Sequence, residues 1–339
     1  MNRSAVTLGR HIIEDEHRHH NTTGELSRLL VQVGFAAKII AREVGRAALV
    51  GKLGLVGKKN ATGDAQKKLD VFANETVIEA FAETGLVAGI LSEELDHVQE
   101  VTAGAAAKYL LCIDPLDGSS NTDINGVLGT IFGVYQCSRE LRGGISGQML
   151  RKGSEQVAAG YVMYGTSTLL IYSCGHGVHG FTLDRDLGEF LLSHENIRCP
   201  RRGPYYSANL GHYREWAPGI QRYVNSLLVS DPVSGRPPSS SRYSGALVAD
   251  VHRSLLEGGL YFYPADAKYP QGKLRLMYEC APLAFVVEQA GGRASTGTIG
   301  ILDVRAESIH QQVPLAIGSA DDVAEYEKVS GGVAVTGAR

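Results

Sequence analysis

The chain has 339 residues, of which 44% are hydrophobic and 20% are charged, as in a globular protein with room for one large domain or two packed halves. Its formal net charge of -3 gives no global basic field, so we expect no nucleic-acid partner. No apolar run reaches the roughly 18 residues of a membrane span and the N-terminus has no signal-like stretch, so we expect no membrane partner and a cytoplasmic location.

The first half of the chain predicts two helices followed by a series of strands. Apolar residues recur at helical spacing from Glu25 to Leu49, with Thr22 and Glu25 in the spacing of a capping box. The segment from Gly51 to Gly63 is rich in glycine and lysine, and we interpret it as a loop. A second helix is predicted from Lys68 to Thr84. The predicted strands are Tyr109 to Ile113, Thr130 to Cys137, Gln156 to Tyr164, Ser167 to Ser173 and Gly177 to Leu183.

The second half begins with a segment rich in proline, glycine and serine, from Cys199 to Ser241, which we interpret as loop-rich. A boundary there divides the chain into two subdomains, residues 1–199 and 200–339. Because helices alternate with strands throughout, the predicted fold class is a layered α/β (α+β) protein. The helices and strands predicted after the boundary are Tyr243 to Glu257, Leu260 to Tyr263, Pro282 to Ala290 and Leu315 to Gly318.

The most informative segment reads Asp-Pro-Leu-Asp-Gly-Ser-Ser-Asn, from Asp114 to Asn121. Pro115 predicts the end of the preceding strand and a turn that brings Asp114 and Asp117 together. Two carboxylates on one turn repel each other and need a compensating cation, although the bare spacing also occurs in solvated loops. The residues that follow suit helix N-caps, whose amides favour an anion. The whole string therefore predicts a divalent metal beside a phosphoester.

Three further acidic patches have the same character. Asp64 and Asp70 follow the glycine-rich segment, Glu93 and Glu94 follow an apolar run, and Glu279 precedes the helix predicted to begin at Pro282. Together with Asp114 and Asp117 they supply enough oxygen ligands for two or three Mg²⁺ ions.

With these residues the chain resembles the class I fructose-1,6-bisphosphatases, which belong to the inositol-monophosphatase-like, lithium-sensitive phosphatases. The resemblance runs from Thr23 to about Ser319, and its specific motifs are Gly63 to Asp70, Tyr243 to Arg253 and Gly272 to Cys280. It implies removal of the 1-phosphate of fructose 1,6-bisphosphate, in gluconeogenesis or the Calvin cycle, by a homotetramer with two to three Mg²⁺ ions per site, or Mn²⁺ in their place.

The resemblance also implies a role for each matching residue. The metal ligands would be Asp64, Glu93, Asp114, the carbonyl of Leu116, Asp117 and Glu279. Asp70 and Glu94 would polarise the attacking water. The 1-phosphate would contact Gly118, Ser119, Ser120 and Arg275. The 6-phosphate would contact Asn209, His212, Tyr243, Tyr263 and Lys273, with Arg242 reaching a neighbouring subunit's pocket.

Two departures from the family pattern concern binding. His212 stands where the family usually has a tyrosine, and Gln136 stands where the animal enzymes have an arginine for AMP. Without that bidentate clamp we expect AMP inhibition to be weak or absent. The other residues of this possible effector site match the family: Thr23, Gly24, Glu25, Leu26, Ser27, Lys108 and Tyr109.

Two other functions stay open at this point. Sedoheptulose 1,7-bisphosphate, with one more sugar carbon, is an alternative or additional substrate. A catalytically silent AMP-binding or scaffolding relative is the second alternative, but it should lack some of the acidic residues, and this chain has them all.

Overall fold

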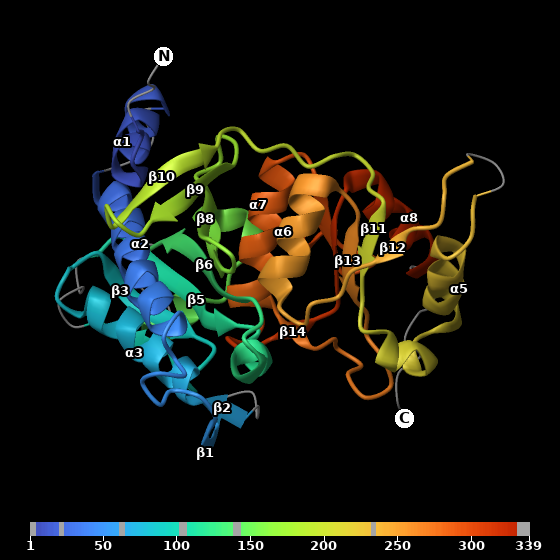
Figure 1. Ribbon diagram of the computed structural model, residues 1–339, viewed down its shortest axis with the longest axis horizontal. Helices are drawn as coiled ribbons and strands as arrows, with labels where there is room; N and C mark the ends of the chain where they lie inside the picture. The colour runs from blue at the N-terminus through green and yellow to red at the C-terminus, as the bar shows by residue number, and fades with distance from the viewer. Residues whose placement is uncertain are drawn as a thin grey trace.

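The computed structural model describes residues 5–19, 24–60, 65–101, 107–137, 144–231 and 235–330. Layers of helices alternate with two main sheets (Figure 1), so the predicted layered α/β class is confirmed. The outer face of the first sheet is covered by α1 (Leu8–His19), α2 (Gly24–Val44) and α3 (Lys68–Ala82). Between the sheets lie α6 (Leu247–Glu257) and α7 (Ala281–Gln289). The far side of the second sheet is covered by α5 (Pro218–Leu227) and α8 (Ala320–Ser330).

Within the described residues the first sheet has eight strands, in the order β10-β9-β8-β7-β6-β5-β3-β4. Neighbouring strands are antiparallel except β3 and β5, which are parallel, with Ser92 opposite Ile113 at their ends. Residues that follow these two strands therefore meet at one edge of the sheet. The strands are β3 (Val87–Ser92), β4 (Gln99–Glu100), β5 (Tyr109–Asp117), β6 (Leu128–Gln136), β7 (Gln156–Tyr164), β8 (Thr168–Ser173), β9 (His179–Asp184) and β10 (Glu189–His194).

Strand β5 is buried along its whole length because helices cover both faces of the sheet. Leu110 and Cys112 belong to the core shared with α6 and α7, whereas Leu111 and Ile113 belong to the core shared with α2 and α3. Alternate side chains thus enter two different cores, and this explains the continuous apolar run in the sequence.

The second sheet has five strands within the described residues, in the order β12-β11-β13-β17-β15. Its members are β11 (Tyr205–Ser207), β12 (Ser240–Ser241), β13 (Leu260–Tyr263), β15 (Arg293–Ser295) and β17 (Leu315–Gly318). The remaining strands form the pairs β1 (Leu55–Lys59) with β2 (Ala65–Lys67) and β14 (Leu274–Arg275) with β16 (Gln312–Val313). A further short α-helix is α4 (Gly144–Gln148), and there are short 3-10 or π-helical turns as well.

Two predictions about the N-terminal half are wrong. The helix predicted to Leu49 ends at Val44, where Gly45 follows, because glycine is a poor helix former and the apolar spacing alone did not show this. The segment predicted as a loop contains β1, a strand with a left-handed Gly57 (φ 82°), which pairs irregularly with β2. The proposed capping residue Thr22 lies outside the described residues.

The prediction that Pro115 ends its strand is also wrong. Strand β5 continues to Asp117 through a bulge, because the register shifts between Asp114, opposite Ile131, and Asp117, opposite Gly129. A bulge leaves the extra residue out of the ladder, so the missing N–H of proline costs little there. The Thr130 hydroxyl donates a hydrogen bond to the Pro115 carbonyl at 2.8 Å and so supports the bulge.

The C-terminal half is more regular than predicted. The segment interpreted as loop-rich holds β11 and α5, and α5 begins at Pro218, which suits the first turn of a helix. The helix predicted from Tyr243 begins only at Leu247, because the preceding turn contains a left-handed Gly245 (φ 80°). The division at Cys199 stays a prediction, since α6 and α7 from the second half share the core of the first sheet.

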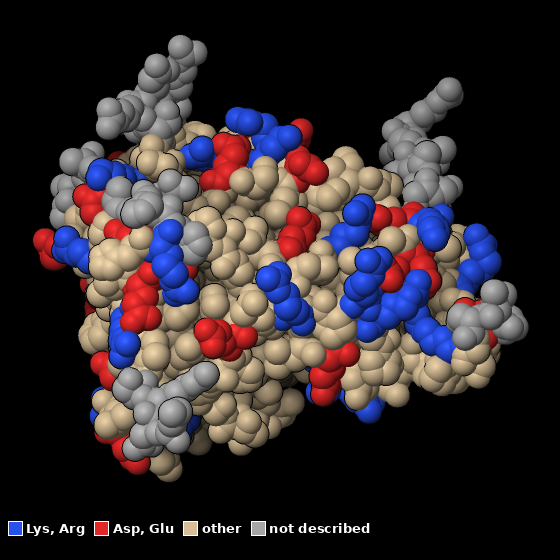
Figure 2. Space-filling model, turned by 90° about the horizontal axis from the view of Figure 1, so that it is seen from above, with Lys and Arg blue, Asp and Glu red and all other residues tan. Residues whose placement is uncertain are grey.

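Basic and acidic side chains are interspersed over the face seen in Figure 2. At the α8 end of the molecule, Arg202 and Arg236 form ion pairs with Asp322 and Glu325. Among the described residues, no helix combines the length and apolar character that a bilayer crossing requires.

Candidate active site

A group of buried carboxylates lies where β5 meets the helices between the two sheets. One oxygen from each of Asp114, Asp117 and Glu279 lies within 4.8 Å of the others, and these residues are only 1%, 7% and 5% exposed. They line a cavity of about 380 Å³ together with Glu93 and Glu94. This cluster, Asp114, Asp117, Glu279 and Glu93, is called the carboxylate cluster below.

The fold assembles the cluster from three separate segments. The bulge after Ile113 holds Asp114 and Asp117, and the Asp114 carboxylate accepts a hydrogen bond from the Leu116 amide at 3.0 Å. Glu93 follows β3 at the same edge, where its amide donates to the Ile113 carbonyl at 3.2 Å. Parallel pairing of β3 and β5 is therefore what brings the two acidic patches together.

The Asp117 carboxylate also joins the two halves of the chain. Its oxygens accept hydrogen bonds from the amides of Leu247 at 3.2 Å and Val248 at 2.8 Å, the first residues of α6. A carboxylate at a helix N-terminus is stabilised by the free amides and by the helix dipole. Gly118, next in the chain, has φ 77°, and a Cβ there would lie 2.6 Å from the Ala246 Cβ. Glycine therefore permits both the turn and its close contact with the start of α6.

Glu279 lies in a buried π-helical turn, Leu276–Cys280, and Arg275 directly precedes this turn. The turn leads into α7. The Glu279 carboxylate accepts a hydrogen bond from the Arg275 amide at 2.5 Å. The Arg275 guanidinium lies 3.3 Å from a Glu93 oxygen. Such π-turns interrupt the regular helix and often occur at functional sites.

Burial dominates the electrostatics of the cluster. It raises the pKa of Glu93 and of Glu279 to about 7, although the Arg275 guanidinium lowers both. It also raises the pKa of Asp117 to about 7 against the two amide hydrogen bonds. For Asp114, burial and then the neighbouring Glu93 raise the pKa. One guanidinium does not balance this many buried carboxylates, so the donor set fits hard divalent cations with oxygen ligands.

We expect the metal-free protein to lose stability as the pH rises from about 4.5 to about 7. The ordinary pKa is 3.8 for Asp117 and 4.5 for Glu93 and Glu279, whereas each is about 7 in the folded chain. In this window the folded state holds more protons than the unfolded state, so the free energy of unfolding falls with pH. Urea denaturation of chelator-treated protein should show that the free energy of unfolding decreases over this pH range. Addition of Mg²⁺ near neutral pH should raise it again. A free energy of unfolding that rises across the window and ignores Mg²⁺ would contradict this expectation.

The two carboxylates expected to act on water differ in their surroundings. Asp70 is 2% exposed and accepts a hydrogen bond from the Lys67 amide at 2.7 Å, at the start of α3. Burial raises its pKa to about 6, while hydrogen bonds from Lys67 and Ser119 lower it. Glu94 accepts a hydrogen bond from the Gln66 side chain at 2.5 Å. Both line the cavity, and the expected ligand Asp64 lies outside the described residues.

The structure brings together most, but not all, of the expected substrate contacts. Asn209, His212 and Arg242 do not line the cavity in this single chain. His212 lies beside the cavity, with its ring centroid 6.2 Å from that of Tyr263, and Arg242 is exposed. The expected contacts that do line the cavity are Gly118, Ser119, Ser120, Tyr243, Tyr263, Lys273 and Arg275.

The sequence reasoning did not name two charged residues of this cavity. Asp250 on α6 is 3% exposed and accepts hydrogen bonds from the Ser244 amide at 3.1 and 3.2 Å. Lys67 forms an ion pair with Asp123. Asp250 lies within the quoted motif from Tyr243 to Arg253, but nothing in its spacing indicated that the helix would turn it toward the cavity.

Part of the possible effector site is also assembled. Lys108 forms an ion pair of 2.6 Å with Glu25 at the start of α2, and Tyr109 pairs with Gln136 across β5 and β6. The Gln136 carbonyl accepts a hydrogen bond from Arg151 at 2.6 Å. Gly24, Leu26 and Ser27 lie in the first turn of α2, whereas Thr23 lies outside the described residues.

Comparison with known proteins gives a consistent result. The family models described as Fructose-1-6-bisphosphatase, N-terminal domain and C-terminal domain match residues 6–195 and 199–331. The protein named Fructose-1,6-bisphosphatase class 1 2 of Acaryochloris marina is 58% identical over 95% of this chain and 96% of its own length. The class 1 protein of Chlorobium luteolum is 50% identical over 97% and 98% of the two chains.

A solved structure agrees with the sequence comparisons. The crystal structure of Leishmania major fructose-1,6-bisphosphatase in holo form superposes with a TM-score of 0.90 at 36% identity, over 97% of this chain and 99% of that one. Both halves of the chain and nearly its full length are thus matched. The chain belongs to the class 1 fructose-1,6-bisphosphatase family.

Proposed function

We propose that this chain hydrolyses fructose 1,6-bisphosphate to fructose 6-phosphate and inorganic phosphate, with Mg²⁺, or Mn²⁺ in its place, as the activating ion. The observation that supports this proposal best is the carboxylate cluster in one cavity with Lys273, Tyr243 and Tyr263. A metal-dependent phosphatase needs clustered carboxylates to bind the ions that act on the reacting phosphate. A lysine and two tyrosine hydroxyls suit the binding of a second phosphate at the far end of the substrate.

The cluster and the carbonyl of Leu116 would hold the ions, with Asp64 supplying a further ligand. When bound, such ions supply positive charge to the phosphoryl oxygens and lower the pKa of a bound water. Arg275 and the amides after Gly118 would hold the reacting phosphate in line with that water. Their preset positions mean that little reorganisation is needed when charge develops on the phosphoryl group.

Asp70 and Glu94 would move the proton. With its raised pKa of about 6, Asp70 is ionised at neutral pH yet basic enough to accept the proton of the attacking water. The oxygen of that water would then bond to phosphorus while the bond from phosphorus to the sugar oxygen breaks, and the leaving sugar oxygen would take up a proton from solvent to become the hydroxyl of fructose 6-phosphate. The hydrogen bond from Gln66 orients Glu94 beside the same site.

A phosphate-release assay tests the proposal. With Mg²⁺ present, purified protein should release phosphate from fructose 1,6-bisphosphate, and a chelator should abolish the release. Running the assay in parallel with sedoheptulose 1,7-bisphosphate tests the alternative substrate. No release from either bisphosphate by folded, Mg²⁺-loaded protein would contradict the proposal and favour the silent relative.

The remaining site residues, location and assembly belong to the same proposal. We place Asn209, His212 and Lys273 at the 6-phosphate in a cytoplasmic homotetramer, where Arg242 contacts the 6-phosphate of a neighbouring subunit. The exposure of Arg242 outside its own cavity supports this arrangement. Sedimentation should then show a tetramer.

Replacing Lys273 by alanine is expected to raise KM by roughly 10- to 100-fold with a much smaller change in kcat. A charged hydrogen bond contributes about 1.5–3 kcal/mol, and contacts far from the bond that breaks stabilise ground and transition states alike. Steady-state kinetics of Lys273→Ala against Lys328→Ala, an exposed lysine on α8, checks this. A large fall in kcat at constant KM would place Lys273 at the reacting phosphate instead.

We expect AMP to inhibit this protein weakly or not at all, and Gln136→Arg to strengthen inhibition. Without the charged, bidentate hydrogen bond, the Kd for AMP should be about 10- to 100-fold higher. Inhibition curves for the parent and Gln136→Arg test this, with Gln99→Arg on the exposed strand β4 as the charge-matched control. Tight AMP inhibition of the parent would show that another basic residue, such as Arg139 or Arg151, supplies the clamp.

A further inference from the structure

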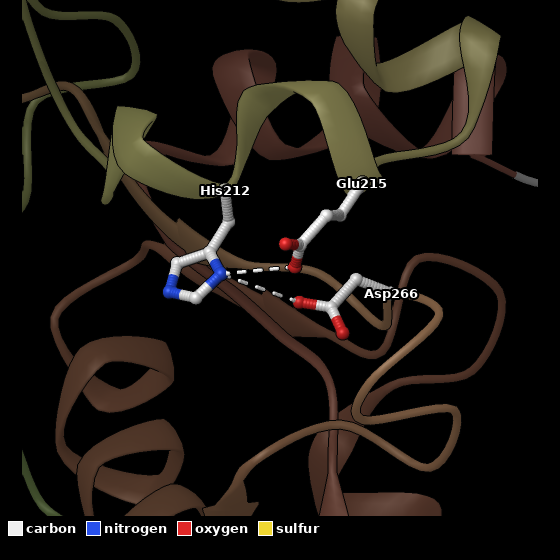
Figure 3. Close-up of side chains that lie close together, drawn as sticks. All are labelled: His212, Glu215 and Asp266. Carbon is white, nitrogen blue, oxygen red and sulfur yellow. Dashed lines mark hydrogen bonds and ion pairs between the residues drawn. The ribbon is translucent and has the colours of Figure 1, made fainter.

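A second group of possible metal ligands lies outside the carboxylate cluster. His212 and Glu215 come from the 3-10 helix Leu210–Glu215, and Asp266 comes from the loop after β13 (Figure 3). One ligand atom from each lies within 4.8 Å of the others. These three residues are called the His212 group below.

The positions of the three side chains fit a metal ion. His212 Nδ1 lies 3.2 Å from Glu215 Oε2 and 3.9 Å from Asp266 Oδ2, and both carboxylates approach the same ring nitrogen (Figure 3). Two ligands at about 2.1 Å from a tetrahedral Zn²⁺ are separated by about 3.4 Å. Both distances to His212 are within about half an ångström of that separation, and water would fill the remaining positions.

Asp266 supplies the independent sign that a cation is needed. Its side chain is fully inaccessible, and its Oδ1 accepts hydrogen bonds from the amides of Lys268 at 2.8 Å and Tyr269 at 2.7 Å. Its Oδ2, which faces His212, accepts no hydrogen bond among the described residues. The amides thus hold the carboxylate in place while one buried oxygen stays unsatisfied, and this is costly unless a cation binds there.

The chemistry of the donors indicates which cation. Within the described part of the chain, Glu215 and Asp266 form no ion pair with a lysine or arginine, and the titratable side chain that both face is His212. An imidazole nitrogen with two carboxylate oxygens suits Zn²⁺ and similar transition metals, whereas Mg²⁺ prefers oxygen ligands alone. The His212 group therefore favours ions of the Zn²⁺ class over Mg²⁺.

We propose that the His212 group binds a transition-metal dication of the Zn²⁺ class. The ion clamps the 3-10 helix Leu210–Glu215 to the loop after β13. Because the ring of Tyr263 lies 6.2 Å from that of His212 and lines the cavity, the clamp fixes one wall of that cavity. The ion uses Nδ1 of His212, which leaves Nε2 for the 6-phosphate contact of the proposed function, and the site does not require that the proposed hydrolysis be correct.

Trp216 provides a direct probe of this site. It is the sole tryptophan of the chain, is 4% exposed and follows Glu215 directly. Co²⁺ should quench its fluorescence when added to the full chain in excess Mg²⁺, which occupies the carboxylate cluster, and Zn²⁺ should reverse the quenching. In His212→Ala and Asp266→Asn the apparent Co²⁺ affinity should fall at least about tenfold. His176→Ala, an exposed histidine between β8 and β9, should behave like the parent.

Metal counting completes the test. After dialysis against Zn²⁺ in excess Mg²⁺, the parent should retain one more equivalent of zinc than Asp266→Asn. Glu215→Gln, a change at a half-exposed side chain that leaves the core intact, should also lose it. Equal zinc content and equal quenching in the parent and all three variants would overturn the site. Since neither readout uses turnover, failure here is distinguishable from failure of the proposed hydrolysis.

Discussion

Replacing Asp117 by asparagine is expected to abolish turnover while the protein stays folded. The neutral amide keeps the shape of the side chain but removes an anionic ligand from the centre of the cluster. Loss of a second-shell partner already costs about 10- to 100-fold in metal affinity, so loss of a direct ligand should cost more. Removing one buried charge from a group of like charges also relieves repulsion, so we expect little loss of stability.

The measurement is the rate of phosphate release over a Mg²⁺ titration, with the denaturation midpoint as the control for folding. Glu257→Gln is the matched variant, since Glu257 lies at the far end of α6, the helix whose first amides bind Asp117, is exposed and pairs only with Arg253 in the described contacts. Its activity should equal that of the parent. Parent-like turnover by folded Asp117→Asn would refute the assignment of Asp117 as a ligand.

Replacing Asp70 by asparagine is expected to lower kcat by about 10²- to 10⁴-fold, the usual contribution of a general base. Metal binding and KM should change little, because Asp70 is assigned to the water and asparagine can still accept the hydrogen bond from the Lys67 amide. A merely structural role would lower stability instead and leave the shape of the pH profile unchanged.

The pH profile of the parent gives a second readout for Asp70. Only the ionised carboxylate accepts a proton, so kcat should rise with pH and level off above an apparent pKa of about 6, or lower when nearby cations are bound. In Asp70→Asn the rise of kcat with pH should disappear, whereas Glu75→Gln, a change on the exposed side of α3, should retain it. If the rise of kcat with pH is unchanged in Asp70→Asn, the titration belongs to another group.

Much of the fold follows from local patterns in the sequence. Strands such as Gln156 to Tyr164 and Leu260 to Tyr263 were predicted to the residue, because their apolar runs are bounded by clear turn signals. The sequence analysis did not predict α1 and α8, because most of their residues are polar. Each helix is stabilised by a few apolar side chains that pack against elements distant in the sequence. Propensity alone does not reveal such partners.

The candidate site likewise has a part that was predicted from local sequence and a part that depends on distant contacts. Asp114 and Asp117 were predicted as neighbours because one short segment holds both, although the bulge that joins them was not foreseen. The approach of Glu279 and the hydrogen bonds from α6 to Asp117 depend on contacts over more than a hundred residues. The family resemblance implied that Glu279 joins the other ligands, whereas the hydrogen bonds from α6 to Asp117 were not predicted, since no spacing in the sequence encodes either contact.

The contact between Asp117 and the start of α6 has a further consequence for substrate choice. In the proposed function the reacting phosphate lies at Asp117, and Tyr243, which contacts the other phosphate, lies four residues before Leu247. Gly118 lies directly against Ala246, where a Cβ would come within 2.6 Å of the Ala246 Cβ, so the turn and the start of α6 are in close contact. If both site assignments of the proposed function hold, the start of α6 would therefore set the distance between the two phosphates. Substrates would be sorted by the length between their charged ends before any contact with the sugar carbons is made.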